Sequence, residues 1–276
     1  MKIVGLFGHP VSHSLSPMMH NLAFEKMALP YRYFAFDINP DQVKQAVDSI
    51  RVLGIRGVNV TIPYKETVIP FLDAVDRSAT MIGAVNTIVN DGGKLTGYNT
   101  DGQGYVMSLE EELNVNVQDL DIVILGAGGA ARGIIFSLLE KNARNIALYN
   151  RNKERAEKLV AEFDKEQASK IMVIHDLEQL HKYHLIINTT PSGMYPNVNE
   201  TPIDIAYVSP SHLVSDIVYN PLMTKFLKQA QTKGATIHHG LGMFIYQGAI
   251  AFELWTGQKP PVQEMYKAVQ THLIKQ

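Results

Sequence analysis

Apolar positions in the first hundred residues switch between the spacing of strands and the spacing of helices. A short apolar run at residues 3–8 predicts a buried strand, and apolar positions at helical spacing in residues 16–27 predict a helix. A strand at residues 31–38, a helix at residues 40–50 and a strand at residues 58–62, in which apolar and polar positions alternate, are predicted next. This order of elements is typical of an α/β domain.

A tight turn is predicted at residues 90–93, where the sequence Asn-Asp-Gly-Gly consists of residue types that tolerate a positive φ. Residues 84–89 and 94–98 flank this turn and carry the composition of strands. We therefore expect an antiparallel pair to close the first sheet, which would be mixed and mostly parallel.

From Asp121 onward, a short apolar run followed by a helical segment repeats along the chain. This rhythm predicts a Rossmann-like domain with a doubly wound, mostly parallel sheet. Its strands are expected at residues 122–125, 146–149, 171–174, 185–188, 213–218 and 236–238.

Two domains are expected, with a helix in residues 101–119 as the link between them. The helical patterns at residues 244–256 and 261–274 exceed what a complete nucleotide-binding domain needs. We expect these last helices to pack back on the first domain. The predicted domains are thus residues 1–102 together with 242–276, and residues 103–241.

Composition narrows the class of partner. The chain has 276 residues with 25 basic and 27 acidic side chains, so it offers no broad basic field for a nucleic acid or an anionic membrane. The absence of cysteine excludes disulfides and thiolate-bound metals and fits a cytoplasmic protein. The opening apolar run is shorter than a secretory or membrane-spanning segment. We expect a small-molecule partner, and a monomer and a homodimer both remain open.

A glycine-rich turn joins the first strand of the second domain to a helix. Its sequence is Gly126-Ala127-Gly128-Gly129-Ala130-Ala131. Gly126 permits the turn, Gly128 lets the backbone approach a pyrophosphate, and Ala131 keeps the helix close to the strand. The free N–H groups of the helix N-terminus favour an anion. The pattern predicts dinucleotide binding, although a tight turn without a ligand would use the same residue types.

The end of the next strand indicates which dinucleotide binds. Its sequence Tyr149-Asn150-Arg151-Asn152 has no acidic residue for a ribose hydroxyl, and Arg155 follows closely. A guanidinium forms paired hydrogen bonds with a phosphate, which favours NADP over NAD. The alternative is that Arg151 and Arg155 are solvated cations at a helix start.

Polar side chains gather in the loops after the strands of the first domain. Ser14 and Ser16 follow the first strand, and Asn59 and Thr61 lead to Lys65. Such loops open onto the ligand crevice of an α/β sheet, and their hydroxyls and amides suit a carboxylate polyol. Other readings remain open, because Ser16 or Asp101 could cap a helix and Lys65 could be an exposed cation.

The order and spacing of several motifs resemble those of the shikimate/quinate dehydrogenase family. The motifs are Ser14-Leu15-Ser16, Asn59-Val60-Thr61 with Lys65, residues 83–87, residues 97–101, residues 126–132, Asn150-Arg151, residues 188–190 with Gly193-Met194, residues 216–221 with Thr224, and residues 240–247. They span nearly the whole chain.

The resemblance implies reversible, NADPH-dependent reduction of 3-dehydroshikimate to shikimate, a step of chorismate and aromatic amino acid biosynthesis, in a cleft between the two domains. It implies that Lys65 and Asp101 flank the reacting oxygen. No metal is expected, because no carboxylate cluster accompanies His238 and His239. The substrate contacts that the resemblance implies are Ser14, Ser16, Asn59, Thr61, Asn86, Tyr219 and Gln247. The cofactor contacts expected from the glycine turn and the resemblance are Gly126, Ala127, Gly128, Gly129, Ala130, Ala131, Asn150, Arg151, Asn152, Arg155, Thr189, Ile217, Gly240 and Met243.

Hydride transfer to a ketone builds negative charge on oxygen, and an ammonium group can stabilise that charge or donate a proton. Lys65 is therefore the first candidate, with Asp101 as the carboxylate that orients it. His238 and His239 receive no role, because neighbours on a strand point to opposite faces. Three alternatives remain: an NAD-preferring quinate/shikimate dehydrogenase, a folate-linked methylene dehydrogenase, and a non-catalytic NADP sensor.

Overall fold

The computed structural model describes residues 1–275 and divides the chain into two compact units. The first unit contains residues 1–104 and 245–276, and the second contains residues 105–244. The divisions fall within helices α4 (Asp101–Leu113) and α9 (Leu241–Thr256). None of the helices in the described part of the chain has both the length and the apolar character needed to cross a membrane.

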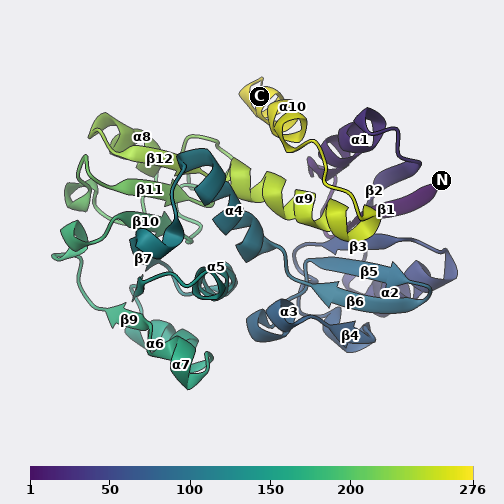
Figure 1. Cartoon of the computed structure of the whole chain (residues 1–276), viewed down its shortest axis with the longest axis horizontal. Helices are drawn as coiled ribbons and strands as arrows, with labels where there is room; N and C mark the ends of the chain where they lie inside the picture. The colour runs from purple at the N-terminus through teal and green to yellow at the C-terminus, as the bar shows by residue number, and fades with distance from the viewer. Residues whose placement is uncertain (276) are drawn as a thin grey trace. The chain divides into compact units, whose positions relative to one another are not determined.

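The first unit contains a mixed sheet of six strands in the order β2-β1-β3-β5-β6-β4. Strands β1, β2 and β3 are parallel, whereas β5 runs antiparallel to both β3 and β6. Figure 1 shows β5 and β6 as the expected hairpin. The strands are β1 (Lys2–Gly8), β2 (Tyr31–Asp37), β3 (Gly57–Val60), β4 (Ala74–Val75), β5 (Thr87–Asp91) and β6 (Lys94–Tyr98).

Two expectations for this sheet are wrong. The hairpin does not close the sheet, because β4 pairs in parallel with the outer side of β6. Strand β3 ends at Val60, and Ile62 is 74% exposed instead of continuing the buried face of Val58. The two-residue strand β4 carries no periodicity that a sequence pattern could reveal.

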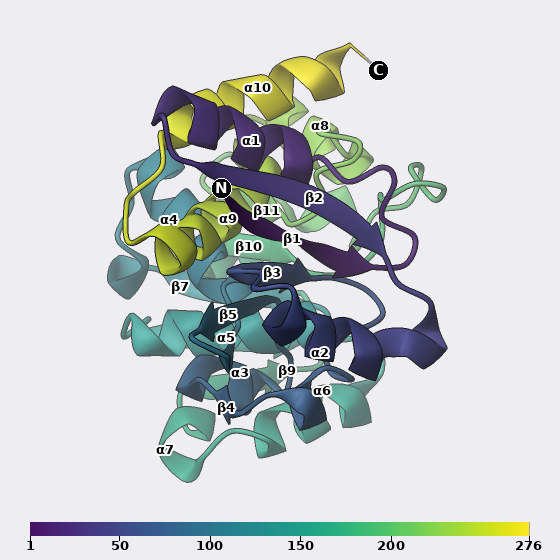
Figure 2. The ribbon, with the colours of Figure 1, turned by 90° about the vertical axis from the view of Figure 1, so that its right-hand side faces the viewer.

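Helices cover both faces of the first sheet. The apolar side chains of α2 (Val43–Val52), including Val47 and Ile50, pack in one core with Val58 of β3. Helices α1 (Ser16–Lys26) and α10 (Val262–Ile274) contact each other and lie over the opposite face from α2 (Figure 2). The remaining helix, α3 (Arg77–Ile82), begins after the capping residue Asp76.

The end of α9 is tied to the first sheet by hydrogen bonds. The indole Nε1 of Trp255 donates to the Ile88 carbonyl at 3.1 Å, and Arg56 Nε donates to the Trp255 carbonyl at 2.9 Å. Trp255 is 1% exposed, and Gly57 packs directly against its indole ring. These contacts explain why residues 245–276 belong to the same compact unit as residues 1–104.

The second unit contains six parallel strands in the order β12-β11-β10-β7-β8-β9. This order confirms the expected doubly wound sheet, with its change of direction between β7 and β10. Ligands of such sheets bind beyond the carboxyl ends of the strands at this point. The strands are β7 (Asp121–Leu125), β8 (Asn145–Tyr149), β9 (Ile171–Ile174), β10 (Leu185–Asn188), β11 (Leu213–Asp216) and β12 (Thr236–His239).

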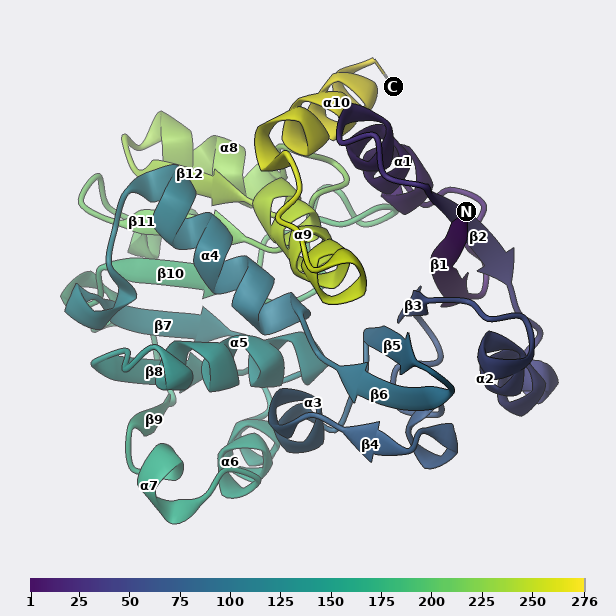
Figure 3. The ribbon, with the colours of Figure 1, turned by 45° about the vertical axis from the view of Figure 1, so that its right-hand side comes forward.

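Helices cover both faces of the second sheet (Figure 3). Phe226 of α8 (Lys225–Thr232) packs in one core with Val214 of β11. The next residue of β11, Ser215, points to the other face and accepts a 2.8 Å hydrogen bond from Tyr105 of α4. The other helices are α5 (Gly129–Glu140), α6 (Lys153–Ala161) and α7 (Lys165–Ala168); single 3₁₀ turns are η1 (Pro40–Gln42), η2 (Ile69–Phe71), η3 (Val117–Asp119), η4 (Leu180–Lys182) and η5 (Ile205–Tyr207).

Candidate active site

Lys65 and Asp101 meet in the first unit. The Lys65 Nζ atom donates to Asp101 Oδ2 at 2.6 Å, and the two side chains are 32% and 23% exposed. Asp101 is the first residue of α4, while the Lys65 carbonyl accepts a 2.7 Å hydrogen bond from the Val85 amide. A lysine–carboxylate pair that is hydrogen bonded and still reached by solvent can contact a ligand.

Asn86 holds the second oxygen of the Asp101 carboxylate. Its Nδ2 donates to Asp101 Oδ1 at 2.9 Å, and its Oδ1 accepts from the Thr100 amide at 2.9 Å. Asn86 is only 3% exposed, so its amide is fixed by protein groups. The sequence identified Asn86 as a substrate contact, whereas the structure also places it as a support for Asp101.

Asn59 lies on β3, opposite Thr87 of β5. Its Nδ2 donates to Thr87 Oγ1 at 3.0 Å, and its Oδ1 accepts from the Tyr33 hydroxyl at 2.8 Å. The Thr87 hydroxyl donates in turn to Asn86 Oδ1 at 3.0 Å. The sequence assigned no role to Tyr33 or Thr87, because the strand register that joins them to Asn59 is not readable from composition.

The two serines after β1 lie at the start of α1. Ser16 is the first helical residue, and its side chain does not cap the helix, so the capping alternative is wrong. Its amide instead donates to Ser14 Oγ at 3.2 Å. The Ser16 side chain is 6% exposed, and burial of the Tyr33 hydroxyl raises the pKa of that group.

Thr61 and Gln247 complete the expected substrate contacts of the first unit. Thr61 follows the end of β3, and its methyl group lies against Gly8 of β1. The Gln247 carbonyl accepts a 3.1 Å hydrogen bond from Thr100 Oγ1, which also accepts from Asn86 Nδ2 at 2.9 Å. Gln247 therefore lies next to Thr100, which contacts the Asn86 side chain that supports Asp101.

The glycine turn lies between β7 and α5 as expected. Gly126 has a φ of 108°, a left-handed conformation that favours glycine, and packs against Thr189 and Thr190. Gly128 is the N-cap of α5, and Gly129 begins the helix with open space where a side chain would stand. The structure thus leaves room for a phosphate at a helix N-terminus.

A pocket of about 280 Å³ adjoins this turn. Arg151 reaches it from the end of β8, and Arg155 reaches it from α6, where its Nε donates to the Ala127 carbonyl at 2.9 Å. The Asn152 side chain instead accepts from the Arg155 amide at 3.0 Å and caps α6. The expected cofactor residues that line the pocket are Gly126, Ala127, Gly128, Asn150, Arg151, Arg155 and Thr189; Gly129, Ala130 and Ala131 lie in α5.

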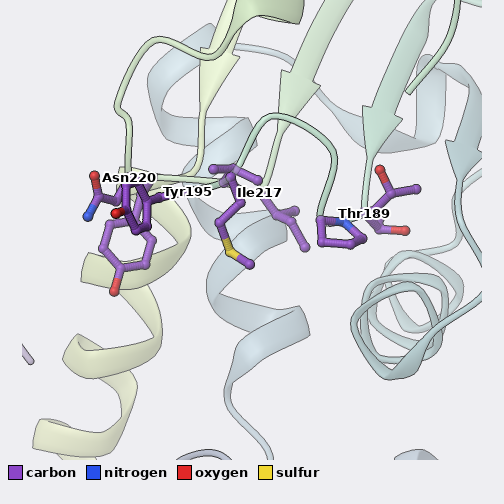
Figure 4. Close-up of a pocket in the computed structure, with 9 residues that line it drawn as sticks. Thr189, Tyr195, Ile217 and Asn220 are labelled. Carbon is purple, nitrogen blue, oxygen red and sulfur yellow. The ribbon is translucent and has the colours of Figure 1, made fainter. Parts of the chain in front are cut away.

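A second pocket of about 530 Å³ lies at the carboxyl ends of β10 and β11 (Figure 4). Thr189 and Ile217, two expected cofactor contacts, line it together with Tyr219, the one expected substrate contact of the second unit. The Tyr219 ring stacks on Phe244 at 5.1 Å, and burial raises the pKa of its hydroxyl. Thr189 lines both pockets, so the two adjoin at the switch point of the sheet.

Gly240 and Met243 lie at the start of α9. Gly240 packs against the Ile217 carbonyl so closely that a Cβ would collide with it, which brings this helix N-terminus next to Ile217. His238 is buried between the hydroxyls of Ser215 and Ser108, and burial lowers its pKa to about 3. Within residues 1–275, no three His, Asp or Glu side chains gather as a metal ion would require.

Asp216, to which the sequence analysis assigned no role, precedes Ile217 and Val218, which line the larger pocket. Its carboxylate is fully buried at the end of β11 and accepts hydrogen bonds from Asn188 Nδ2, the Val218 amide and Thr224 Oγ1 at 3.0, 3.0 and 2.8 Å. Burial nevertheless raises the pKa of Asp216 to about 6. The carboxylate therefore fixes the pocket loop at a cost in free energy when it is ionised.

We expect Asp216→Asn to change how the stability of the protein depends on pH. Because the folded pKa of Asp216 is raised from 3.8, its contribution is fully present below pH 3.8 and is lost as the pH rises through about 6. The loss corresponds to about 3 kcal/mol by pH 8. An asparagine is never ionised and its Oδ1 can accept from Asn188 and Val218, although its Nδ2 cannot accept from Thr224. The variant should therefore gain stability relative to the unmodified protein as the pH rises from 5 to 8.

Urea unfolding at pH 5 and pH 8 measures this difference. Asp119→Asn is the matched control, since Asp119 is an exposed aspartate of the same unit. A stability gap between Asp216→Asn and the unmodified protein that stays constant from pH 5 to pH 8 would contradict the account of Asp216.

Models of one enzyme family match most of the chain. The model described as the shikimate dehydrogenase substrate binding domain matches residues 6–88, and the shikimate / quinate 5-dehydrogenase model matches residues 108–212. The model of the shikimate 5'-dehydrogenase C-terminal domain matches residues 240–270.

Full-length relatives agree with these models. A shikimate dehydrogenase (NADP(+)) of Geobacillus kaustophilus is 52% identical over 268 residues, 97% of each chain. A shikimate dehydrogenase crystallised in complex with NADP+ is 44% identical, with a TM-score of 0.91 over 99% of this chain and 96% of that one. The shikimate 5-dehydrogenase of Listeria monocytogenes, solved with shikimate and NAD, is 37% identical, with a TM-score of 0.91 over 98% of this chain and 96% of that one.

Proposed function

Because this chain belongs to the shikimate dehydrogenase family, we propose that it catalyses the reversible, NADPH-dependent reduction of 3-dehydroshikimate to shikimate. It is thus an oxidoreductase that acts on a CH–OH group, in chorismate and aromatic amino acid biosynthesis. The observation that carries the proposal is the 2.6 Å contact of Lys65 Nζ with Asp101 Oδ2. A cytoplasmic setting belongs to the same proposal and is supported by the absence of cysteine.

Lys65 and Asp101 act on the carbonyl oxygen of the substrate. NADPH, when bound, would supply the hydride to the carbonyl carbon. The Lys65 ammonium group, within hydrogen-bond reach of that oxygen, stabilises the charge that develops there. Asp101 fixes the direction of the Lys65 N–H bonds, and Asn86 in turn fixes the Asp101 carboxylate. The pair therefore stabilises the alkoxide and provides a path along which the alkoxide gains a proton.

The first unit provides most of the contacts with shikimate in this proposal. The hydroxyls of Ser14 and Ser16 suit the substrate carboxylate, and the 3.2 Å bond from the Ser16 amide to Ser14 Oγ holds the two residues together where α1 begins. Amide groups suit the ring hydroxyls, since each can both donate and accept. The remaining proposed contacts are Asn59, Thr61, Asn86, Gln247 and, from the second unit, Tyr219.

The second unit binds the dinucleotide in this proposal. The N-terminus of α5 takes the pyrophosphate, and Arg151 takes the 2′-phosphate of the adenosine. Arg155, which donates to the Ala127 carbonyl, holds the glycine turn in place. Ile217, Gly240 and Met243 contact the nicotinamide end, which suits the apolar lining of the larger pocket.

A four-way steady-state assay tests the proposal. The purified chain is supplied with shikimate or quinate, each with NADP or NAD, and formation of the reduced cofactor is followed by absorbance. We expect the highest kcat/KM for shikimate with NADP, because Arg151 faces the pocket where NAD would lack a phosphate. The measurement includes NAD because the Listeria monocytogenes structure contains it.

Two other outcomes would favour the alternative functions. Faster turnover of quinate with NAD would identify the quinate/shikimate alternative. Binding of NADP, measured by calorimetry, without turnover of either acid would identify a sensor and contradict the proposed reaction. Size-exclusion chromatography with light scattering distinguishes a monomer from a homodimer.

A further inference from the structure

We propose that Tyr33 and Thr87 are positioning residues that set the orientation of the substrate-binding amides and, through them, of the Asp101 carboxylate. This inference rests on the proposed function of Asn59 and Asn86 and extends it to two buried hydroxyls. One continuous set of hydrogen bonds connects these side chains within the first unit. In order, it runs through Tyr33, Asn59, Thr87, Asn86, Asp101 and Lys65.

Thr87 is the point where the two amides meet. Its Oγ1 accepts from Asn59 Nδ2 and donates to Asn86 Oδ1, both at 3.0 Å. A hydroxyl can accept and donate at once, so one Thr87 oxygen fixes which end of each amide faces inward. Thr87 is 0% exposed, which leaves no water to replace it in either role.

The orientation of Asn86 decides what Asp101 contacts. With its oxygen toward Thr87 and the Thr100 amide, Asn86 presents Nδ2 to Asp101 Oδ1 at 2.9 Å. A rotated Asn86 amide would present an oxygen to the carboxylate, which repels it. Thr87 therefore helps keep a donor against Asp101, and the other carboxylate oxygen stays free for Lys65.

Tyr33 performs the corresponding task for Asn59. Its hydroxyl donates to Asn59 Oδ1 at 2.8 Å, so the Asn59 amide is fixed at its oxygen by Tyr33 and at its nitrogen by Thr87. The Tyr33 ring is 1% exposed and lies parallel to the His20 ring at 4.5 Å. This packing holds the hydroxyl against Asn59.

Thr87→Val tests the inference, because valine keeps the shape of threonine and removes only its hydroxyl. We expect kcat with shikimate to fall about tenfold and the KM for shikimate to rise about tenfold, since each amide loses one buried hydrogen bond. Thr87→Ser keeps the hydroxyl, so both constants should remain within about threefold of the unmodified enzyme. Thr256→Val is the matched control, because it removes a hydrogen-bonded hydroxyl of α9 outside this set.

Tyr33→Phe tests the hydrogen bonds of Asn59 separately from those of Asn86. Its hydroxyl contacts Asn59 but not Asn86, so the KM for shikimate should rise about fivefold while kcat changes less than twofold. A merely structural role predicts another pattern, in which a smaller folded fraction lowers kcat and leaves KM unchanged. If Thr87→Val does not fold, the KM of Tyr33→Phe decides, and an unchanged value overturns the inference.

Two further results would overturn the role of Thr87. One is a folded Thr87→Val with both constants within about threefold of the unmodified enzyme; the other is Thr87→Ser as impaired as Thr87→Val. Side-chain amide NMR signals give a readout without turnover. Those of Asn59 and Asn86 should resist solvent exchange in the unmodified protein and in Thr87→Ser, but not in Thr87→Val. If the unmodified chain does not oxidise shikimate, the proposed function fails while this NMR comparison still decides the positioning role.

Discussion

Replacing Lys65 by methionine is expected to lower kcat for shikimate oxidation about 10²- to 10⁴-fold, the range for loss of a positioned acid–base group. Methionine keeps the length of the side chain and removes the ammonium group that contacts Asp101 at 2.6 Å. The KM for shikimate should change much less, because Asn59 and the serines of α1 are untouched. Initial rates of NADPH formation measure both constants.

Asp101→Asn and the double variant extend this test. Since the two side chains act on one oxygen, the double variant should be no slower than the slower single variant. Lys44→Met and Asp48→Asn are matched controls, because these residues form an exposed ion pair on α2 at 2.7 Å. Rates that multiply in the double variant, or near-normal turnover of Lys65→Met, would contradict a joint role.

The second large effect is expected at Arg151. Arg151→Ala should lower kcat/KM for NADP about 30- to 150-fold, the worth of a charge-assisted bond between a guanidinium and a phosphate. The value for NAD should be unchanged within about threefold, since NAD has no 2′-phosphate. The preference for NADP would then be lost, which saturation curves with both dinucleotides measure directly.

Arg155 and Arg144 separate specific from general effects of charge. Arg155 Nε donates to the Ala127 carbonyl, so Arg155→Ala should loosen the glycine turn and impair NADP and NAD alike. Arg144 is an exposed cation of the same unit outside both pockets, and Arg144→Ala should leave both cofactors unaffected. Equal losses for both cofactors in Arg151→Ala would refute a contact with the 2′-phosphate.

Periodicity predicted the parallel strands of the second unit well, because each buried strand is a compact apolar run. Ile122 to Leu125 and Leu185 to Asn188 are completely buried in the structure. Without such a run, the two half-buried residues of β4 were missed, and the end of β3 was placed at Ile62 instead of Val60. The pattern of apolar positions therefore identifies elements that are fixed by the burial of their own side chains. It fails for elements that are fixed by pairing with a neighbouring strand.

In the candidate site, too, the sequence predicted some residues and not others. Lys65, Asp101 and Asn86 were identified from motifs and lie within hydrogen-bond distance of one another. Tyr33 was not, since it is one apolar position of a strand, and Thr87 lies in the motif at residues 83–87 but gains its partner Asn59 only through the β3–β5 register. Side chains that act through a cross-strand neighbour leave no local signal in the sequence.

The first unit is interrupted in the sequence, and this has a consequence for synthesis on the ribosome. Residues 105–244 form a continuous unit that is translated before residues 245–276 exist. Until then, the nascent sheet lacks α10 beside α1 and the Trp255 indole against Ile88. The second unit can thus fold as it emerges, whereas the first stays incompletely covered until its final helices leave the exit tunnel.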